Sequence, residues 1–209
     1  MEWYIVVSIV SLGICLAGLT WHAIRIIRAG APVDLAAPAS VTAPAIVYSF
    51  SGAMSPAKKE SAYLHLPTYT AGIFYHLGTF LAILLFFLAL AGIRLPEALN
   101  YAVSGFMGIS FLCGTGMLVK RITKKGMREL SNPDDYISNA LVTAFHLATN
   151  LALIYPKLAP AYFLITSLLC LWVPVGKLRH AVFFFAARYH LGFFYGRRGV
   201  WPPRNSSTS

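Results

Sequence analysis

The stretch FYHLGTFLAILLFFLALAGI, residues 74 to 93, carries one side chain that can be charged near neutral pH, His76, among 20 residues. A helix of about 20 mostly apolar residues is long enough to cross a hydrocarbon core of about 30 Å. The chain as a whole is similar in character, with 57% hydrophobic residues, 11% charged residues and a mean hydropathy of +0.65. This composition, gathered into long apolar runs, predicts an integral membrane protein.

Five apolar segments reach the length of a transmembrane helix, and no alternating ten-residue pattern suggests a barrel. They lie near residues 3–24, 69–93, 99–119, 136–155 and 161–175. The segment AVFFFAA after His180 is expected to continue the fifth as an interfacial helix. We therefore predict an all-α, five-helix transmembrane bundle, with one domain over residues 1–200 and a disordered tail over residues 201–209.

The positive charges predict the orientation of the bundle. With alternating loops, 15 of the 17 lysines and arginines fall on one side, and only Arg94 and Lys157 fall on the other. The positive-inside rule then places the N-terminus outside and the C-terminus in the cytoplasm of a multi-pass protein of the inner (cytoplasmic) membrane. Anionic lipid headgroups of the bilayer explain the net charge of +10 without any nucleic acid.

The cytoplasmic side holds the longest connection, residues 29–66, which is rich in Ala, Pro and Ser and shows neither a hydrophobic period nor a span. We interpret this loop as a docking surface for a cytoplasmic partner, together with the basic and then acidic residues 120–135 and the basic C-terminal segment. For residues 29–66 a solvated connector is an equal alternative.

The cysteines favour packing over metal chemistry. Cys15, Cys113 and Cys170 lie inside predicted spans without a C-x-x-C pair, so iron–sulfur and zinc frameworks are unsupported. No phosphate-binding loop, nucleophile elbow or paired-carboxylate motif is present, and we predict no catalytic residue. Any chemistry would therefore depend on the histidines.

Two histidines are expected at matching depths. His76 lies nine residues after Pro67, roughly 13 Å along its helix, and His180 lies at the inner end of the fifth, antiparallel span. Two facing neutral imidazoles are the ligands of a six-coordinate b-type haem, and Gly78 would let a bulky group approach the backbone. The haem propionates would then meet nearby cations, namely Lys177, Arg179 and Arg188.

Each histidine also has a simpler explanation. Either His76 or His180 alone could make an interhelical hydrogen bond or lie in the headgroup layer. For His146, near the middle of the fourth span, an interhelical bond without a cofactor ranks first, ahead of a second haem or a quinone. His22 and His190 are expected at the membrane interface.

At these residues the sequence resembles a known family. The five-helix plan with an outside N-terminus, FYHLG at residues 74–78, and P-x5-H from Pro174 to His180 are similar to the gamma subunit of respiratory nitrate reductase. Its relatives include the membrane cytochromes b associated with heterodisulfide and sulfite reductases. The likeness covers most of residues 1–190 as an architecture, and only the two motifs are specific.

The resemblance implies a haem b-containing subunit of a respiratory oxidoreductase. Such a subunit transfers electrons between the quinone pool, menaquinone or ubiquinone, and a cytoplasmic iron–sulfur partner. His76 and His180 would hold the haem nearer the cytoplasm. The terminal substrate would be handled by another subunit, so this chain would be an electron-transfer component of the enzyme.

The sequence departs from the family pattern at the outer haem. Phe86 and Tyr162 stand where that pattern has its two further histidines, so we expect one haem, with a second possible if His146 contributes. A quinone site is expected on the inner side, where His65, Lys59 or Tyr69 could supply a polar contact. The alternative function is a membrane anchor or assembly scaffold without haem; a transporter is a weaker third.

Overall fold

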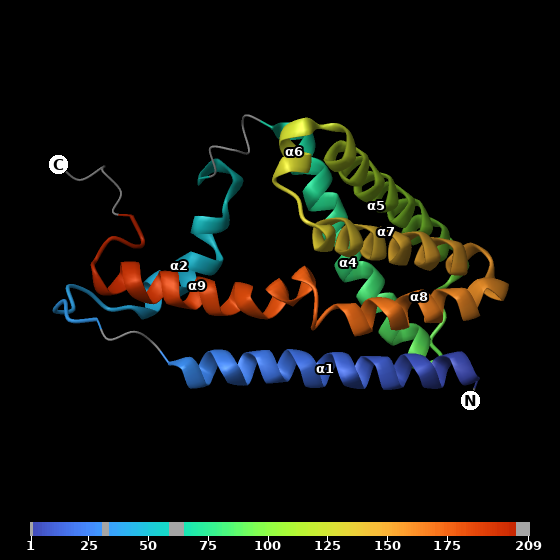
Figure 1. The fold of residues 1–209 in the computed structure, drawn as a ribbon, viewed down its shortest axis with the longest axis horizontal. Coiled ribbons are helices and arrows are strands. Elements are labelled where there is room, and N and C mark those ends of the chain that lie inside the picture. The colour runs from blue at the N-terminus through green and yellow to red at the C-terminus, as the bar shows by residue number, and fades with distance from the viewer. Residues whose placement is uncertain (1, 31–33, 59–64, 204–209) are drawn as a thin grey trace. The chain divides into compact units, whose positions relative to one another are not determined.

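A computed structural model gives the structure of residues 2–30, 34–58 and 65–203 (Figure 1). Over this part of the chain the regular structure is helical, without strands. Its helices long and apolar enough to cross a membrane are α1 (Trp3–Ala29), α4 (Leu66–Leu90), α5 (Glu97–Thr123) and α7 (Pro133–Ile154). The helices α8 (Ala159–Trp172) and α9 (His180–Arg197), with the short helices η3 (Pro156–Leu158) and η4 (Lys177–Arg179), are long and apolar enough together for a fifth span but are bent by 71° at the break, so they form either a broken span or a re-entrant loop.

The predicted all-α class and the first four spans are thus confirmed, with boundaries that differ by a few residues. Local signals explain the ends. Gly30 and Gly92 follow α1 and α4 at positive φ, 68° and 72°, a conformation that favours glycine after a helix. The α7 helix starts with a capping box between Asn132 and Asp135, with Pro133 in the first turn. The orientation of the termini remains a prediction.

The loop at residues 29–66 differs from the expectation of a segment without regular structure. It contains α2 (Ala43–Phe50), η1 (Gly52–Met54) and η2 (Pro56–Lys58). The apolar sequence APAIVYSF is only eight residues long, too short for a span, yet it forms a helix because α9 provides a surface on which it packs. Trp201 also packs against Tyr48 and Tyr195 instead of belonging to a disordered tail.

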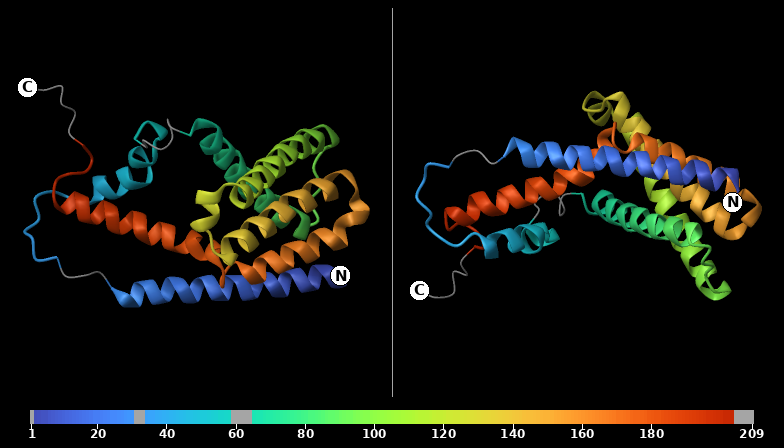
Figure 2. Two further views of the ribbon diagram at one scale, coloured as in Figure 1. Left: turned by 45° about the horizontal axis from the view of Figure 1, so that its top comes forward. Right: turned by 90° about the horizontal axis from the view of Figure 1, so that it is seen from below.

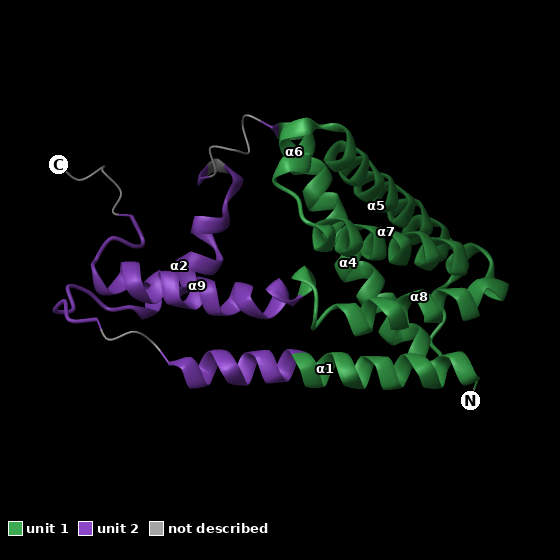
Figure 3. Ribbon diagram, in the orientation of Figure 1, with its two compact units in different colours: residues 1–18, 66–178 green, residues 19–65, 179–209 purple. Residues whose placement is uncertain are grey.

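The chain forms two compact units (Figure 3). Unit 1 comprises residues 1–18 and 66–178, and unit 2 comprises residues 19–65 and 179–209. In unit 1, α5 packs against α4 and α7, and α7 packs against α8 (Figure 2).

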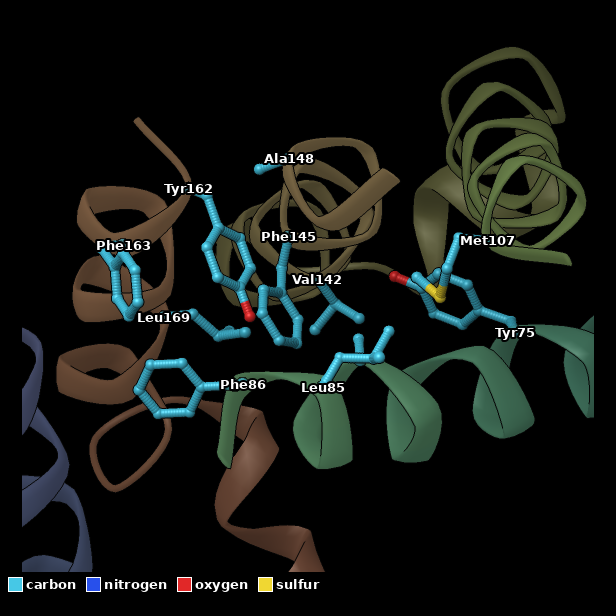
Figure 4. Close-up of a cluster of buried hydrophobic side chains, with 11 residues drawn as sticks. Tyr75, Leu85, Phe86, Met107, Val142, Phe145, Ala148, Tyr162, Phe163 and Leu169 are labelled. Atoms are coloured by element: carbon cyan, nitrogen blue, oxygen red, sulfur yellow. The ribbon is translucent and has the colours of Figure 1, made fainter. Parts of the chain in front are cut away.

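The core of unit 1 is largely aromatic. Phe145 of α7 stacks on Tyr162 of α8 with ring centroids 6.3 Å apart, and Phe86 of α4 contacts Phe163 of α8 at 6.1 Å (Figure 4). Met107 of α5 is fully buried beside Tyr75 of α4 (Figure 4). These rings join α4, α7 and α8 by close packing, which is the main source of helix association in lipid.

Small residues let the helices of unit 1 approach closely. Gly78 was expected to admit a bulky group, but a Cβ there would overlap the Ser110 hydroxyl of α5, so this glycine serves a helix–helix contact. Ser8 of α1 donates a hydrogen bond to the Phe163 carbonyl at 2.8 Å and lies 2.8 Å from the Ser167 hydroxyl. Small and hydroxyl-bearing residues are common at such interfaces.

Unit 2 is built around the contact between α2 and α9. A Cβ at Gly192 would lie 2.5 Å from Cα of Ile46 and 2.9 Å from the Ala45 carbonyl oxygen, so only glycine permits this approach. Ser49 at the end of α2 donates a hydrogen bond to the Arg188 carbonyl at 2.6 Å. The α2 helix is therefore fixed to the polar backbone of α9 as well as to its apolar face.

Candidate functional site

His76 projects from the exposed surface of unit 1, on the membrane-spanning helix α4. Its Nδ1 atom lies 2.7 Å from the carbonyl oxygen of Gly72, one turn earlier. A carbonyl only accepts hydrogen bonds, so Nδ1 carries a proton in this contact, and in the neutral form of the ring Nε2 would then have the free lone pair. This is the tautomer that a histidine uses when Nε2 binds a metal and Nδ1–H is held by a carbonyl.

His146 has a contrasting environment, because its ring is fully buried between α4, α5 and α7. Its Nε2 lies 3.0 Å from the Thr79 hydroxyl of α4, and its Nδ1 lies 3.0 Å from the Ser110 hydroxyl of α5. The Tyr75 ring packs edge-on at 4.9 Å. Both nitrogens of His146 are therefore used in interhelical hydrogen bonds, the interpretation ranked first from sequence.

The second predicted haem ligand, His180, lies in unit 2, where it is the exposed first residue of α9. His76 belongs to unit 1, and its pairing with His180 remains a prediction.

Of the predicted propionate cations, Lys177 forms an ion pair with Asp135 at 2.7 Å within unit 1. Arg179 lines a cavity together with His22 and Arg25. Neither contact could be read from the sequence spacing.

Arg188 is the predicted propionate cation with the most unusual surroundings. Its side chain is partly buried, and the Nε and Nη2 atoms are buried without a hydrogen-bond partner in the described structure. Leaving a buried charged donor unsatisfied costs more than leaving a neutral one. The guanidinium group is thus suited to receive an anionic oxygen, which a haem propionate would provide.

The other histidines take up separate positions. His65 is exposed immediately before α4, and His190 is partly buried in α9 beside the Tyr189 ring. Tyr69 lies in the first turns of α4, within the same helix as His76. Lys59, the third residue suggested for a quinone contact, lies outside the described residues.

Phe86 and Tyr162 are the two residues that stand, by the resemblance noted from sequence, where outer-haem histidines would be expected. Both side chains are buried, with relative exposures of 3% and 5%, and their rings contact each other at 6.5 Å. They belong to the aromatic core shown in Figure 4. These two residues therefore pack α4 against α8.

In unit 2, the carboxylate of Asp34 forms ion pairs with Arg197 and Arg198. The Ala36 backbone N–H and the Arg198 guanidinium donate hydrogen bonds to its carboxylate at 3.1 and 2.8 Å, and Arg197 lies 3.6 Å away. These donors hold the pKa of Asp34 below its ordinary value, with the Ala36 bond as the largest cause. The carboxylate thus links the segment after α1 to the end of α9.

Among the described residues, no group of three or more His, Cys, Asp or Glu side chains could hold a metal ion. A two-histidine haem site falls below that number. Comparison with family models, with curated proteins and with solved structures found no match for the chain.

Proposed function

We propose that this chain is a haem b-bearing subunit of a quinone-linked respiratory oxidoreductase in the inner membrane. His76 and His180 would bind the iron, and Arg188 would neutralise a propionate. The observation that carries the proposal is the His76 ring, which stands exposed on a membrane helix with Nδ1 held by the Gly72 carbonyl, an arrangement that leaves Nε2 of the neutral ring able to bind a metal. A polar, ionisable side chain in a span is costly unless something binds it, so the exposed imidazole calls for a partner.

Each proposed residue has a separate part. The Gly72 carbonyl orients the His76 ring and fixes its tautomer, which raises the ability of Nε2 to act as a ligand. The unpartnered Nε and Nη2 atoms of Arg188 support a role in holding an anionic group. Haem, when bound, would accept and pass on single electrons between a quinol and the partner protein. His65 or Tyr69, near the start of α4, would be the polar contact for the quinone.

The proposed partner is a cytoplasmic iron–sulfur protein. The structure leaves fewer candidate contacts for it than the sequence suggested, because α2 packs on α9 and part of the 120–135 segment is paired internally. Arg121 and Lys177 both form ion pairs with Asp135, at 3.4 and 2.7 Å. Lys124 and Arg128 are exposed and belong to the same segment, so they are the preferred docking residues. Crosslinking from these two positions in native membranes should capture the iron–sulfur protein.

The test is an optical difference spectrum, reduced minus oxidised, of the purified chain. We expect the signal of a low-spin b-type haem. His76→Ala and His180→Ala should each lower haem affinity by at least about 10–100-fold. Loss of a group that only hydrogen-bonds a metal ligand already lowers metal affinity by that much, and these variants lose the ligand itself. Haem that remains should be five-coordinate and should bind carbon monoxide.

The matched control is His190→Ala, which removes a histidine from the same helix as His180, ten residues further along. It should leave the low-spin spectrum unchanged. A colourless, folded preparation of the unaltered protein would contradict the proposal and favour the anchor without haem. A normal bis-histidine spectrum in either His76→Ala or His180→Ala would show that this pair is not the ligand set.

A further inference from the structure

A cavity of about 380 Å³ opens in unit 2, between the last turns of α1 and the start of α9. Its volume is within the usual range for a small-ligand site, about 300–1,000 Å³. One part of its wall is basic and titratable and the other is apolar, and the lining residues are His22, Arg25, Arg179, Ile26, Ala29 and Phe183. The His22 and Phe183 rings contact each other at 5.9 Å.

Within the described residues, no acidic side chain forms an ion pair with the two arginines of the cavity, Arg25 and Arg179. Asp34 is the one carboxylate of unit 2 within the described residues, and it is engaged by Arg197 and Arg198. Arg179 is also the N-cap of α9 and makes no side-chain capping bond, so the positive end of the helix dipole adds to the charge of the guanidinium groups.

The cavity lies at the end of a membrane-spanning helix. The 27 residues of α1 extend about 40 Å at 1.5 Å per residue, whereas a hydrocarbon core of about 30 Å needs about 20 residues. If the core begins near Trp3, the last two turns of α1, with Arg25 and Ala29, would therefore extend into the headgroup layer. A ligand bound there would place a charged group beside the arginines and a hydrocarbon part beside Ile26 and Phe183.

We propose that this cavity binds the phosphate group of an anionic phospholipid. Arg25 and Arg179 would contact the phosphate oxygens, since guanidinium groups bind phosphate through paired N–H donors. Phe183 and Ile26 would contact the glycerol and the first carbons of the acyl chains. A free phosphate ion has the same charged chemistry but would leave this apolar half of the wall without a ligand contact, so the lipid is the better fit. The site involves neither His76 nor Arg188, so it stands independently of the proposed haem.

The experiment uses the full chain in nanodiscs that contain phosphatidylcholine and phosphatidylglycerol, followed by native mass spectrometry of the released protein. Retention of phosphatidylglycerol in preference to phosphatidylcholine is expected. Arg25→Gln with Arg179→Gln should weaken retention by about tenfold for each arginine, as expected for the loss of a charge-assisted hydrogen bond of about 1.5 kcal/mol. Both side chains are exposed, so the variant should fold, which circular dichroism checks.

The matched control combines Arg28→Gln and Arg128→Gln, which removes the same charge from exposed positions outside the cavity lining. It should retain phosphatidylglycerol as the unaltered chain does, and so should His76→Ala. Equal loss in the two arginine pairs would overturn the proposal in favour of general surface attraction. Displacement of the lipid by inorganic phosphate would overturn the lipid as the source of the phosphate. Loss of lipid in His76→Ala would tie retention to the haem and overturn an independent site.

Discussion

Two histidines of the same unit meet the cost of an imidazole in a membrane helix by different means. His146 lies in the core, where hydroxyl groups from two neighbouring helices bond both of its ring nitrogens. His76 satisfies one nitrogen on its own helix and presents the other at the exposed surface. The first arrangement is complete within the chain, whereas the second leaves one ring nitrogen for the haem iron that we propose it binds.

Replacing His146 with alanine tests this distinction at a single residue. We expect a loss of about 2 kcal/mol in unfolding free energy, from two interhelical bonds of about 0.6 kcal/mol each together with the cavity left by the ring. The measurement is the thermal unfolding of the purified variant in detergent, recorded with its haem spectrum. The haem signal per folded protein should not change. Loss of the low-spin signal at unaltered thermal stability would instead make His146 a ligand.

Close approach between α4 and α5 depends on glycine, and this contact gives a prediction for the helix pair. Gly78→Ala should destabilise the protein by about 1–3 kcal/mol, because the new methyl group would overlap the side chain of Ser110, whose Cβ cannot move without its backbone. The measurement is the thermal unfolding midpoint in detergent.

Gly72→Ala is the matched control, since it changes the same helix at a position with nothing within 4 Å of the added Cβ. It should be neutral or stabilising by up to about 1 kcal/mol through helix propensity. Adding Ser110→Gly to Gly78→Ala should restore part of the lost stability. Equal effects of the two alanine substitutions would show that α4 and α5 do not meet at Gly78.

Elements differ in how far sequence alone predicts them. The apolar length that defines α1, α4, α5 and α7 is a property of each segment by itself, so these helices were predicted to within a few residues. The α2 helix was missed because its eight residues are stabilised by α9, a partner more than 130 residues away in the chain. Gly78 was misjudged for the same reason, since Ser110 comes from another helix, and the Lys177–Asp135 ion pair could not be foreseen because its two residues lie 42 positions apart.

For the candidate site, sequence identified the residue types but not their surroundings. The histidine in FYHLG predicted an ionisable group in a span, and the structure adds the tautomer that the Gly72 carbonyl imposes. The buried, unpartnered nitrogens of Arg188 and the cavity beside Arg179 depend on side chains from several segments. No spacing rule in a single sequence encodes such neighbours.

At the scale of the whole molecule, the distribution of charge makes the most direct prediction. Of the 17 lysines and arginines, Arg94 and Lys157 belong to the short connections after α4 and α7, and the positive-inside rule puts these connections outside. Lys124, between α5 and α6 (Lys125–Glu129), would then face the cytoplasm. The proposed cytoplasmic partner depends on this orientation.

Single cysteines can test the orientation in a chain whose native Cys15, Cys113 and Cys170 are replaced by alanine. A membrane-impermeant maleimide applied to intact spheroplasts should label Lys157→Cys and should not label Lys124→Cys, because only the first would lie outside. After the membrane is permeabilised with detergent, both positions should react, which controls for accessibility. Labelling of Lys124→Cys alone in intact spheroplasts would reverse the topology. In that case an iron–sulfur partner could not dock on the basic face from the cytoplasm, and the proposed electron route would fail with it.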